Sequence, residues 1–278
     1  MFKKIFVFFA FLFFSFSSAF SRINEDVVHD ALGFMLGGDS GWGAVTNEYE
    51  IDGLTPAHPL RHVSSQDINM EINNGEKVGL VGNIGSGKTS LLRNIIGYYL
   101  PKKGNVNLGG YDLKNIPSNN LREFIGYCPQ KIQLFTGTVL ENISAGTDNI
   151  SDEDVIEAAK LSCAHDFITK LPGGYNYILS ESGSNLSGGQ RQAIALARCL
   201  VRKPKILVLD EPTSSMDGAT EEKIINNILS LPYKPTVIIS THRTNHLTRV
   251  DKIGVLIDGQ LVQFGARDSI LKQNNENN

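Results

Sequence analysis

The hydrophobic positions of this chain form short, nearly continuous runs, which are typical of strands buried on both faces. Three such runs cover residues 77–81, 206–209 and 237–240. After the first run, apolar residues recur at helical spacing in the segment 91–96. Buried strands of this length alternating with helical patterns predict an α/β domain.

The pattern also predicts where individual elements begin and end. Ser151 is followed by three acidic residues and then by apolar ones, so a helix is expected to begin after a serine cap. Two apolar runs, 253–257 and 260–264, flank an Asp-Gly pair and predict a β-hairpin. The asparagine-rich end, 273–278, has the composition of a disordered tail.

Residues 1–20 differ in composition from the rest of the chain. Nine of the 14 Phe residues lie there, and two lysines precede an uninterrupted apolar run from Ile5 to Phe14 that is followed by small residues. Such a segment is typical of a secretory signal. Because a membrane span needs ~20 apolar residues, the run makes at most a marginal anchor. We expect a signal-peptide-like segment or a membrane anchor; a displaced start codon or a membrane remnant is the further interpretation.

Residues 21–48 show no hydrophobic periodicity. The glycine-rich stretch 37–43 contains turn formers but has neither the lysine nor the following helix of a phosphate-binding loop. We interpret residues 21–48 as a linker, or as the remnant of a domain whose front part is absent.

Composition limits the classes of protein that fit. The 278 residues are 41% hydrophobic and 20% charged, which excludes collagen, a coiled-coil rod and wholesale disorder. The formal net charge of −3 argues against a basic nucleic-acid-binding surface, so no nucleic-acid partner is expected. Three Cys residues are too few for a disulfide framework and favour a reducing compartment. Pro59 separates His58 from His62 and disrupts a shared helical face, so no metal site built from histidines is expected.

A glycine-rich loop follows the strand expected at 77–81. It matches G-x-x-x-x-G-K-[ST] in full and precedes the apolar helix. Glycines let backbone N–H groups surround an anion, and the helix N-terminus adds positive partial charge. Lys88 is expected to reach the β and γ phosphates, and the hydroxyl of Thr89 to hold Mg²⁺. The candidate nucleotide-binding residues are Gly82, Asn83, Ile84, Gly85, Ser86, Gly87, Lys88, Thr89 and Ser90.

Two further motifs complete the expected site. The strand at 206–209 leads into Asp210 and Glu211, which suit a water-mediated Mg²⁺ contact and the polarisation of an attacking water, respectively. The pentapeptide 186–190 opens a helix expected over 190–200, and its bare N–H groups at a positive helix end form a second anion site. The candidate anion-binding residues of this second site are Ser187, Gly188, Gly189 and Gln190.

In this order, the motifs resemble the nucleotide-binding domain of ATP-binding cassette (ABC) transporters, over about Tyr49 to Leu271. The resemblance implies an ABC ATP-binding domain over 49–272, with the α/β fold of a P-loop NTPase on a mixed β core, an antiparallel β subdomain and an inserted helical subdomain at about 134–204. It also implies a homodimer in which each ATP lies between the phosphate loop of one chain and the signature pentapeptide of the other. By itself, each of the two anion sites would contact the nucleotide from one side only.

The resemblance assigns roles to further residues. Gln130 is expected to sense Mg²⁺ and water, although a surface residue after a proline is the simpler interpretation. His242 is expected to contact the γ-phosphate rather than only to satisfy a strand end. Asp217 either starts a turn or contacts the partner across the dimer, and Tyr49 is the candidate for stacking on adenine. The expected catalytic residues are Glu211, His242 and Gln130, and the expected Mg²⁺ contacts are Thr89, Gln130 and Asp210.

Finer features resemble exporters. Residues 135–143 are similar to the exporter stretch that follows the glutamine loop. Ser182 stands where exporter cassettes carry an arginine that touches the membrane domain, so that contact is in question. The Ile-Gly-Ser-Gly-Lys loop and the Met of Ser-Ser-Met-Asp are similar to cassettes of type I protein secretion.

The resemblance thus implies an ATPase that powers export by ATP-driven dimerisation at the cytoplasmic face of a membrane. A secretion-type cassette follows six membrane helices, whereas this sequence has at most one apolar segment. We expect a truncated half-transporter, a stand-alone cassette that docks on a separate transmembrane permease, or a gene fragment with a new leader. Two alternatives stay open: a remnant that binds ATP without transport, and a soluble ABC ATPase acting on DNA or ribosomes, although the tandem cassettes or coiled-coil insertions usual in that class are absent from the sequence.

Overall fold

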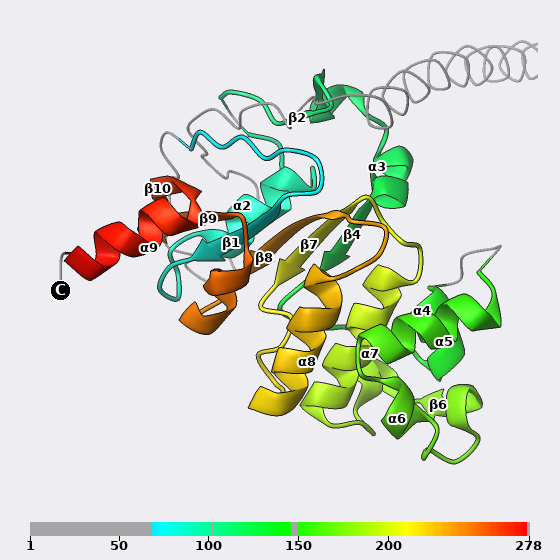
Figure 1. The fold of residues 1–278 in the computed structure, drawn as a ribbon. Helices are drawn as coiled ribbons and strands as arrows, with labels where there is room; N and C mark the ends of the chain where they lie inside the picture. Colours follow the sequence, from blue (N-terminus) through cyan, green and yellow to red (C-terminus); the bar gives the residue numbers. More distant parts are fainter. Residues whose placement is uncertain (1–67, 102, 146–149, 277–278) are drawn as a thin grey trace, which may run out of the picture.

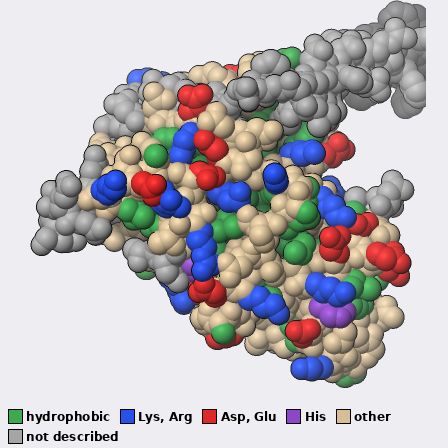
Figure 2. All heavy atoms as spheres, in the orientation of Figure 1, with side chains coloured by type: hydrophobic (Ala, Val, Ile, Leu, Met, Phe, Trp, Pro, Cys, Tyr) green, Lys and Arg blue, Asp and Glu red, His purple; other side chains and the backbone are tan. Residues whose placement is uncertain are grey.

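A computed structural model describes residues 68–101, 103–145 and 150–276 of the chain. The expectations for the leader, for the linker and for Tyr49 concern residues outside this range. In the described part, no helix is both long and apolar enough to cross a membrane. Basic and acidic side chains are interspersed over the face drawn in Figure 2, so the coloured residues of that face form no patch of one sign.

A six-stranded sheet lies at the centre of the described part, with strand order β10-β9-β1-β8-β7-β4 (Figure 1). Five neighbouring strands run parallel, and β10 returns antiparallel to β9, which confirms the predicted mixed sheet and C-terminal hairpin. The strands are β1 (Lys77–Val81), β4 (Ile125–Cys128), β7 (Ile206–Asp210), β8 (Thr236–Ser240), β9 (Lys252–Ile257) and β10 (Gln260–Ala266).

Both faces of this sheet are covered, as the continuous apolar runs predict. Successive side chains of a strand point to opposite faces. Val208 and Ile238 therefore join the cluster that includes α2 (Lys88–Ile95) on one face. Leu207 and Ile239 join the cluster on the other face, where α7 (Gly188–Leu200) and α8 (Gly218–Leu229) pack. The central strands are held by apolar burial on both sides, so their carboxyl ends are fixed in position.

The strand register brings three chain segments to one edge. Ser240 at the end of β8 lies beside Leu80 of β1 and beside Asp210 of β7. The loops that follow these three parallel strands consequently begin next to one another, although they are far apart in sequence. Such an edge is where ligands bind in open α/β sheets.

The chain between β4 and β7 adds a largely helical lobe, below β4 and β7 in Figure 1. A short antiparallel ladder pairs its two strands. Ser151 caps α5, accepting a hydrogen bond from the Asp154 N–H at 3.1 Å, as the sequence predicts. The elements are β5 (Gly137–Thr138), α4 (Val139–Ser144), α5 (Asp152–Leu161), α6 (His165–Ile168), η2 (Gly174–Asn176), β6 (Ile178–Leu179), η3 (Glu181–Gly183) and α7.

The remaining elements flank the sheet. They are the antiparallel pair β2 (Asn107–Leu108) and β3 (Tyr111–Asp112), with η1 (Leu113–Asn115), α3 (Ser118–Phe124), η4 (Thr244–Arg249) and α9 (Arg267–Glu276). Helix α9 corrects one expectation: residues 273–276 are helical, where the composition predicts a disordered tail. Ile270 of this helix packs with Leu247, Val250 and Ile253, which fixes the start of the helix on the sheet.

The close approach of α7 to β4 yields a test of the fold. A Cβ on Gly126 would lie 2.7 Å from the carbonyl oxygen of Cys199 and 2.8 Å from Cγ of Pro204. We expect Gly126→Ala to lower the free energy of unfolding by about 1–3 kcal/mol, because overpacking forces the helix away from the strand. Urea unfolding followed by circular dichroism measures the change.

Gly265→Ala is the matched control, since a Cβ there meets nothing within 4 Å. We expect its stability to stay within about 0.5 kcal/mol of the wild type. Equal stabilities of the two variants would contradict the described packing of α7 against β4.

Candidate functional site

The loop of residues 82–89 joins β1 to α2, and its glycines meet specific steric demands. A Cβ on Gly82 would lie 2.3 Å from the carbonyl oxygen of Leu256, so no other residue fits there without displacing backbone. Gly87 precedes α2 with a φ of 99°, in the left-handed region that glycine tolerates. The result is a curled backbone ending at a helix N-terminus, which is the geometry expected for an anion-binding loop.

Lys88 lies inside this loop with only 5% of its surface exposed. Its Nζ donates hydrogen bonds to the carbonyl oxygens of Gly82 (2.7 Å) and Asn83 (3.1 Å). Burial lowers the pKa of the Lys88 ammonium, while the nearby carboxylates of Glu211 and Asp210 act in the opposite direction. A buried cation in a ring of backbone groups can bind phosphate oxygens.

Asp210 ends β7 and is almost completely buried. One carboxylate oxygen accepts from Oγ1 of Thr89 at 2.7 Å, and the other accepts from Oγ of Ser240 at 2.7 Å. The Thr89 hydroxyl and the Asp210 carboxylate, predicted from two distant motifs, are thus in direct contact. Together they offer the oxygen ligands that hard divalent cations prefer.

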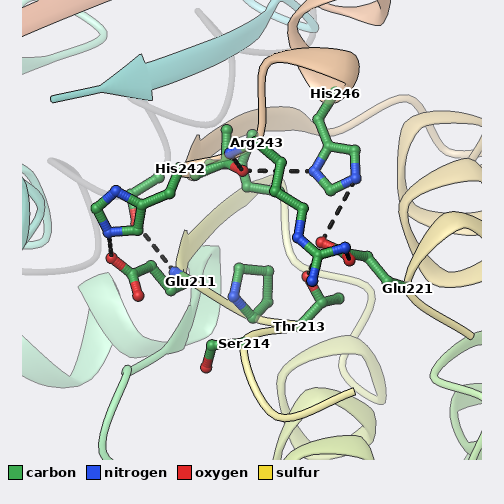
Figure 3. A pocket seen from close by; sticks show the side chains of 11 residues that line it. Glu211, Thr213, Ser214, Glu221, His242, Arg243 and His246 are labelled. Carbon is green, nitrogen blue, oxygen red and sulfur yellow. Dashed lines mark hydrogen bonds and ion pairs between the residues drawn. The ribbon is translucent and has the colours of Figure 1, made fainter. Parts of the chain in front are cut away.

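Glu211 follows immediately, at the turn that ends β7. Its φ of 50° is unusual for a residue with a side chain, so the chain turns sharply here. Its carboxylate accepts from Nε2 of Gln130 at 2.9 Å and contacts Nε2 of His242 (Figure 3). The structure therefore brings together the three residues that the sequence analysis names as catalytic.

Two residues that support Glu211 were missed by the sequence analysis. Ser240 accepts from the Glu211 N–H at 2.9 Å, so this one hydroxyl links β8 to both acidic residues. Gln192 donates from Nε2 to the Glu211 carbonyl oxygen at 2.9 Å, and its Oε1 accepts from the Ser215 N–H at 2.9 Å. The available signal for Gln192 was its spacing of four residues from Leu196 on the buried face of α7.

The signature pentapeptide lies at the start of α7. Oγ of Ser187 accepts from the Gln190 N–H at 3.2 Å, and Oε1 of Gln190 accepts from the Ser187 N–H at 2.9 Å, which forms a capping box. Gln190 therefore serves the helix cap with its side chain. Gly188 and Gly189 lie against Ser215, where an added Cβ would be as close as 3.1 Å to backbone.

Asp217 has a comparable local role at α8. Its carboxylate accepts from the N–H groups of Ala219 (3.1 Å) and Thr220 (2.9 Å), so it caps the helix. The hydrogen bonds from Thr220 and Ala219 hold the pKa of Asp217 below its usual value. Of its two interpretations, the simpler one as a turn-starting residue agrees with this geometry.

Comparison with known proteins places this geometry in a family. The ABC transporter family profile matches residues 65–214, a range that contains the phosphate loop, Gln130, the signature and the two carboxylates. The alpha-hemolysin translocation ATP-binding protein HlyB of Escherichia coli is 42% identical over 215 residues, covering 77% of this chain and 30% of HlyB. The leukotoxin translocation ATP-binding protein LktB of a Pasteurella haemolytica-like species is 42% identical over 209 residues, covering 75% of this chain and 30% of LktB.

Among solved structures, a bacterial Atm1-family ABC exporter with ATP bound is similar, with a TM-score of 0.76 and 31% identity. The match covers 85% of this chain and 40% of that exporter chain. The chain spans about a third of the length of the curated relatives that it matches. The phosphate loop and the two carboxylates start from adjacent strand ends, and the family profile covers more than half of the chain, so the protein belongs to the ABC transporter family, as an ATP-binding cassette.

Proposed function

We propose that this cassette hydrolyses MgATP and thereby powers export across a membrane, working as a homodimer with a transmembrane permease part in trans. The observation that carries the proposal is the set of contacts around Glu211. Its carboxylate is held by Gln130 and His242, at the same sheet edge as Lys88 and the Thr89–Asp210 pair. A remnant under no functional constraint would not need these distant residues to be in mutual contact.

The loop is suited to the phosphates of ATP. Oγ of Ser86 is buried and has no hydrogen-bond partner among the described residues, although it lies at the centre of the loop. An orphaned polar atom of this kind fits a site completed by a polar ligand. In the proposed complex, Lys88 exchanges its bonds to loop carbonyl oxygens for bonds to phosphate oxygens, and the N–H groups of the loop surround the anion.

The residues present also fit a magnesium ion. Thr89 and Asp210 supply oxygen atoms, and Gln130, whose amide nitrogen bonds to Glu211, has an amide oxygen to offer. Within the described residues, no group of three His, Cys, Asp or Glu side chains could hold a metal ion by itself. This agrees with Mg²⁺, which commonly binds through one or two protein groups together with phosphate oxygens and water. When bound, the ion would neutralise phosphate charge.

Hydrolysis requires a base for the attacking water. We propose that the Glu211 carboxylate accepts the water's proton, while His242 contacts the γ-phosphate and Gln130 orients the water. The rigidity of the base supports this role, since Ser240 and Gln192 hold the Glu211 backbone from two sides. A base held in this way loses little orientational freedom when the substrate binds.

Export and dimerisation are supported by the relatives. HlyB and LktB carry translocation in their names, and both are 42% identical to this chain. The phosphate loop starts α2 and the signature starts α7, so the two proposed anion sites lie at the N-termini of different helices. We propose that the signature of a second copy closes over the nucleotide, at the cytoplasmic face of a membrane.

The nucleotide assignment predicts the effect of Lys88→Ala. This change removes the buried cation of the loop and leaves only backbone dipoles for the phosphates. We expect ATP binding at micromolar concentrations to be abolished in a fluorescence titration. Lys160→Ala, at an exposed position of α5, is the control and should bind like the wild type. Wild-type affinity in Lys88→Ala would refute the assignment of the loop.

The hydrolytic role predicts a different outcome for Glu211→Gln. The amide keeps size and hydrogen bonding but cannot accept the proton, so phosphate release should fall by ~10²–10⁴-fold while ATP and Mg²⁺ still bind. With ATP retained, the variant should dimerise on ATP addition in size-exclusion chromatography at several protein concentrations. The wild type should cycle back to monomer.

The same variant tests the ATP sandwich. In the Glu211→Gln background, Ser187→Arg places a bulky charge at the signature and should remove the ATP-dependent dimer without affecting binding to the monomer. Ser230→Arg, at an exposed serine after α8, is the matched control and should leave the dimer intact. Dimers that persist with Ser187→Arg would argue against the sandwich arrangement.

The permease part of the proposal predicts an apolar contact at Phe135. This residue is 45% exposed, and the guanidinium of Arg198 lies 5.4 Å from its ring centroid. We expect a transmembrane permease to be retained by the tagged chain when both are purified from detergent-solubilised membranes of the native host, and Phe135→Asp to lose this retention. Ile257→Asp, at a 52% exposed position of β9, should retain it. Equal retention of both variants would count against docking through Phe135.

A further inference from the structure

We infer that Glu221 is a positioning residue for hydrolysis: by binding Arg243 and Thr213, it sets the relative positions of the segments that carry His242 and Glu211. The inference rests on the proposed ATPase function and adds a residue outside the motifs of the nucleotide site. Glu221 does not contact Glu211 or His242 in the structure, so its effect is exerted through its neighbours.

Glu221 lies in the first turn of α8 and is only 3% exposed. Its carboxylate forms an ion pair with Arg243 and accepts from Oγ1 of Thr213 at 2.9 Å. Nε2 of His246 lies 3.5 Å from the same carboxylate. Figure 3 shows these groups converging on Glu221 from the segment after β7 and from the segment after β8.

The two partners are close to the catalytic residues along the chain. Arg243 directly follows His242, and Thr213 comes two residues after Glu211. The segment after β8 is also tied internally, since Oγ1 of Thr241 accepts from the Arg243 N–H at 3.0 Å. A displacement of Arg243 is therefore transmitted to His242, and a displacement of Thr213 to the turn at Glu211.

Close packing does not set the distance between these segments. A cavity of about 200 Å³ lies between them, with Glu211 and His242 on one side and Glu221, Arg243 and His246 on the other. The pairing of β7 with β8, and the contacts of Ser240 with Asp210 and Glu211, set where the two segments start. Beyond the strand ends, where the cavity separates the segments, the Glu221 carboxylate is a polar group that contacts both of them.

The contacts of the buried Glu221 carboxylate favour one separation of the two segments over others. Burying a carboxylate is costly, and a buried ion pair repays this cost only with good geometry and further hydrogen bonds. Thr213 supplies such a bond, and both Thr213 and His246 are buried. One Glu221 oxygen is paired only through the ion pair with Arg243, and the other accepts from Thr213, so a movement of either segment would cost the carboxylate one of these contacts. The network therefore resists changes in the separation of the segments.

The test is steady-state hydrolysis by the full chain carrying Glu221→Gln, together with ATP titration of the same samples. Loss of the ion pair between Glu221 and Arg243 should lower kcat by roughly 10- to 100-fold, because small misplacements of catalytic groups have effects of this size. The Kd for ATP should change by less than about twofold. Glu222→Gln is the matched control: its side chain is 47% exposed and pairs with Arg249 on the surface, so kcat should be unchanged.

A second pair of variants separates positioning from stability. Arg243→Met alone leaves Glu221 buried without its cation and should lower both Tm and kcat. Adding Glu221→Gln removes the unpaired charge, so Tm should recover toward the wild type while kcat stays low. Arg243→Lys, which keeps a cation, should retain more of the wild-type kcat than Arg243→Met.

Several outcomes would overturn the inference. They are a wild-type kcat in Glu221→Gln, a loss of ATP affinity in parallel with kcat, or recovery of kcat together with Tm in the double variant. Absence of hydrolysis by the wild type would instead overturn the proposed function and, with it, the inference. The wild-type rate therefore distinguishes the two failures.

Discussion

Parallel pairing of β1, β8 and β7 is the constraint on which the site depends. The register places Ser240 beside both Leu80 and Asp210, so the phosphate loop, the His242 segment and the two carboxylates start from adjacent points. Apolar burial on both sheet faces holds these strands in place, and this fixes the positions of the polar side chains at the strand ends. The geometry of the site therefore depends on the rigidity of the hydrophobic core behind it.

The polar groups at this edge are connected in series. Ser240 joins Asp210 to the backbone of Glu211, Gln192 joins Glu211 to the segment before α8, and Glu221 joins that region to Arg243. Each connection uses a buried or nearly buried polar side chain with a defined partner. A single displaced member would leave an unsatisfied group, which favours concerted movement of the edge over independent movement of its loops.

Local signals made much of this predictable. The phosphate loop could be found because its geometry is encoded by glycines at fixed offsets, and the α5 cap because Ser151 and its acidic neighbours act within one turn. The roles of Ser240, Gln192 and Glu221 could not be found this way, since each depends on a partner brought near by tertiary pairing. The tail was misjudged from 273 to 276 because composition ignores the anchoring of α9 through Ile270.

The bonds between Lys88 and the carbonyl oxygens of its own loop have a thermodynamic consequence. Two of the three N–H donors of the Lys88 ammonium already bond to carbonyl oxygens of the loop, so in the proposed complex nucleotide binding would exchange these hydrogen bonds for more strongly charge-assisted ones. Part of the enthalpy of phosphate contact is thus offset by the bonds that are given up. In return, the ammonium is held near its working position before ATP arrives, and little side-chain entropy is lost on binding. Such a loop lowers the affinity for the nucleotide but keeps the lysine positioned for binding. A moderate affinity suits a cassette that releases its nucleotide after each round of hydrolysis.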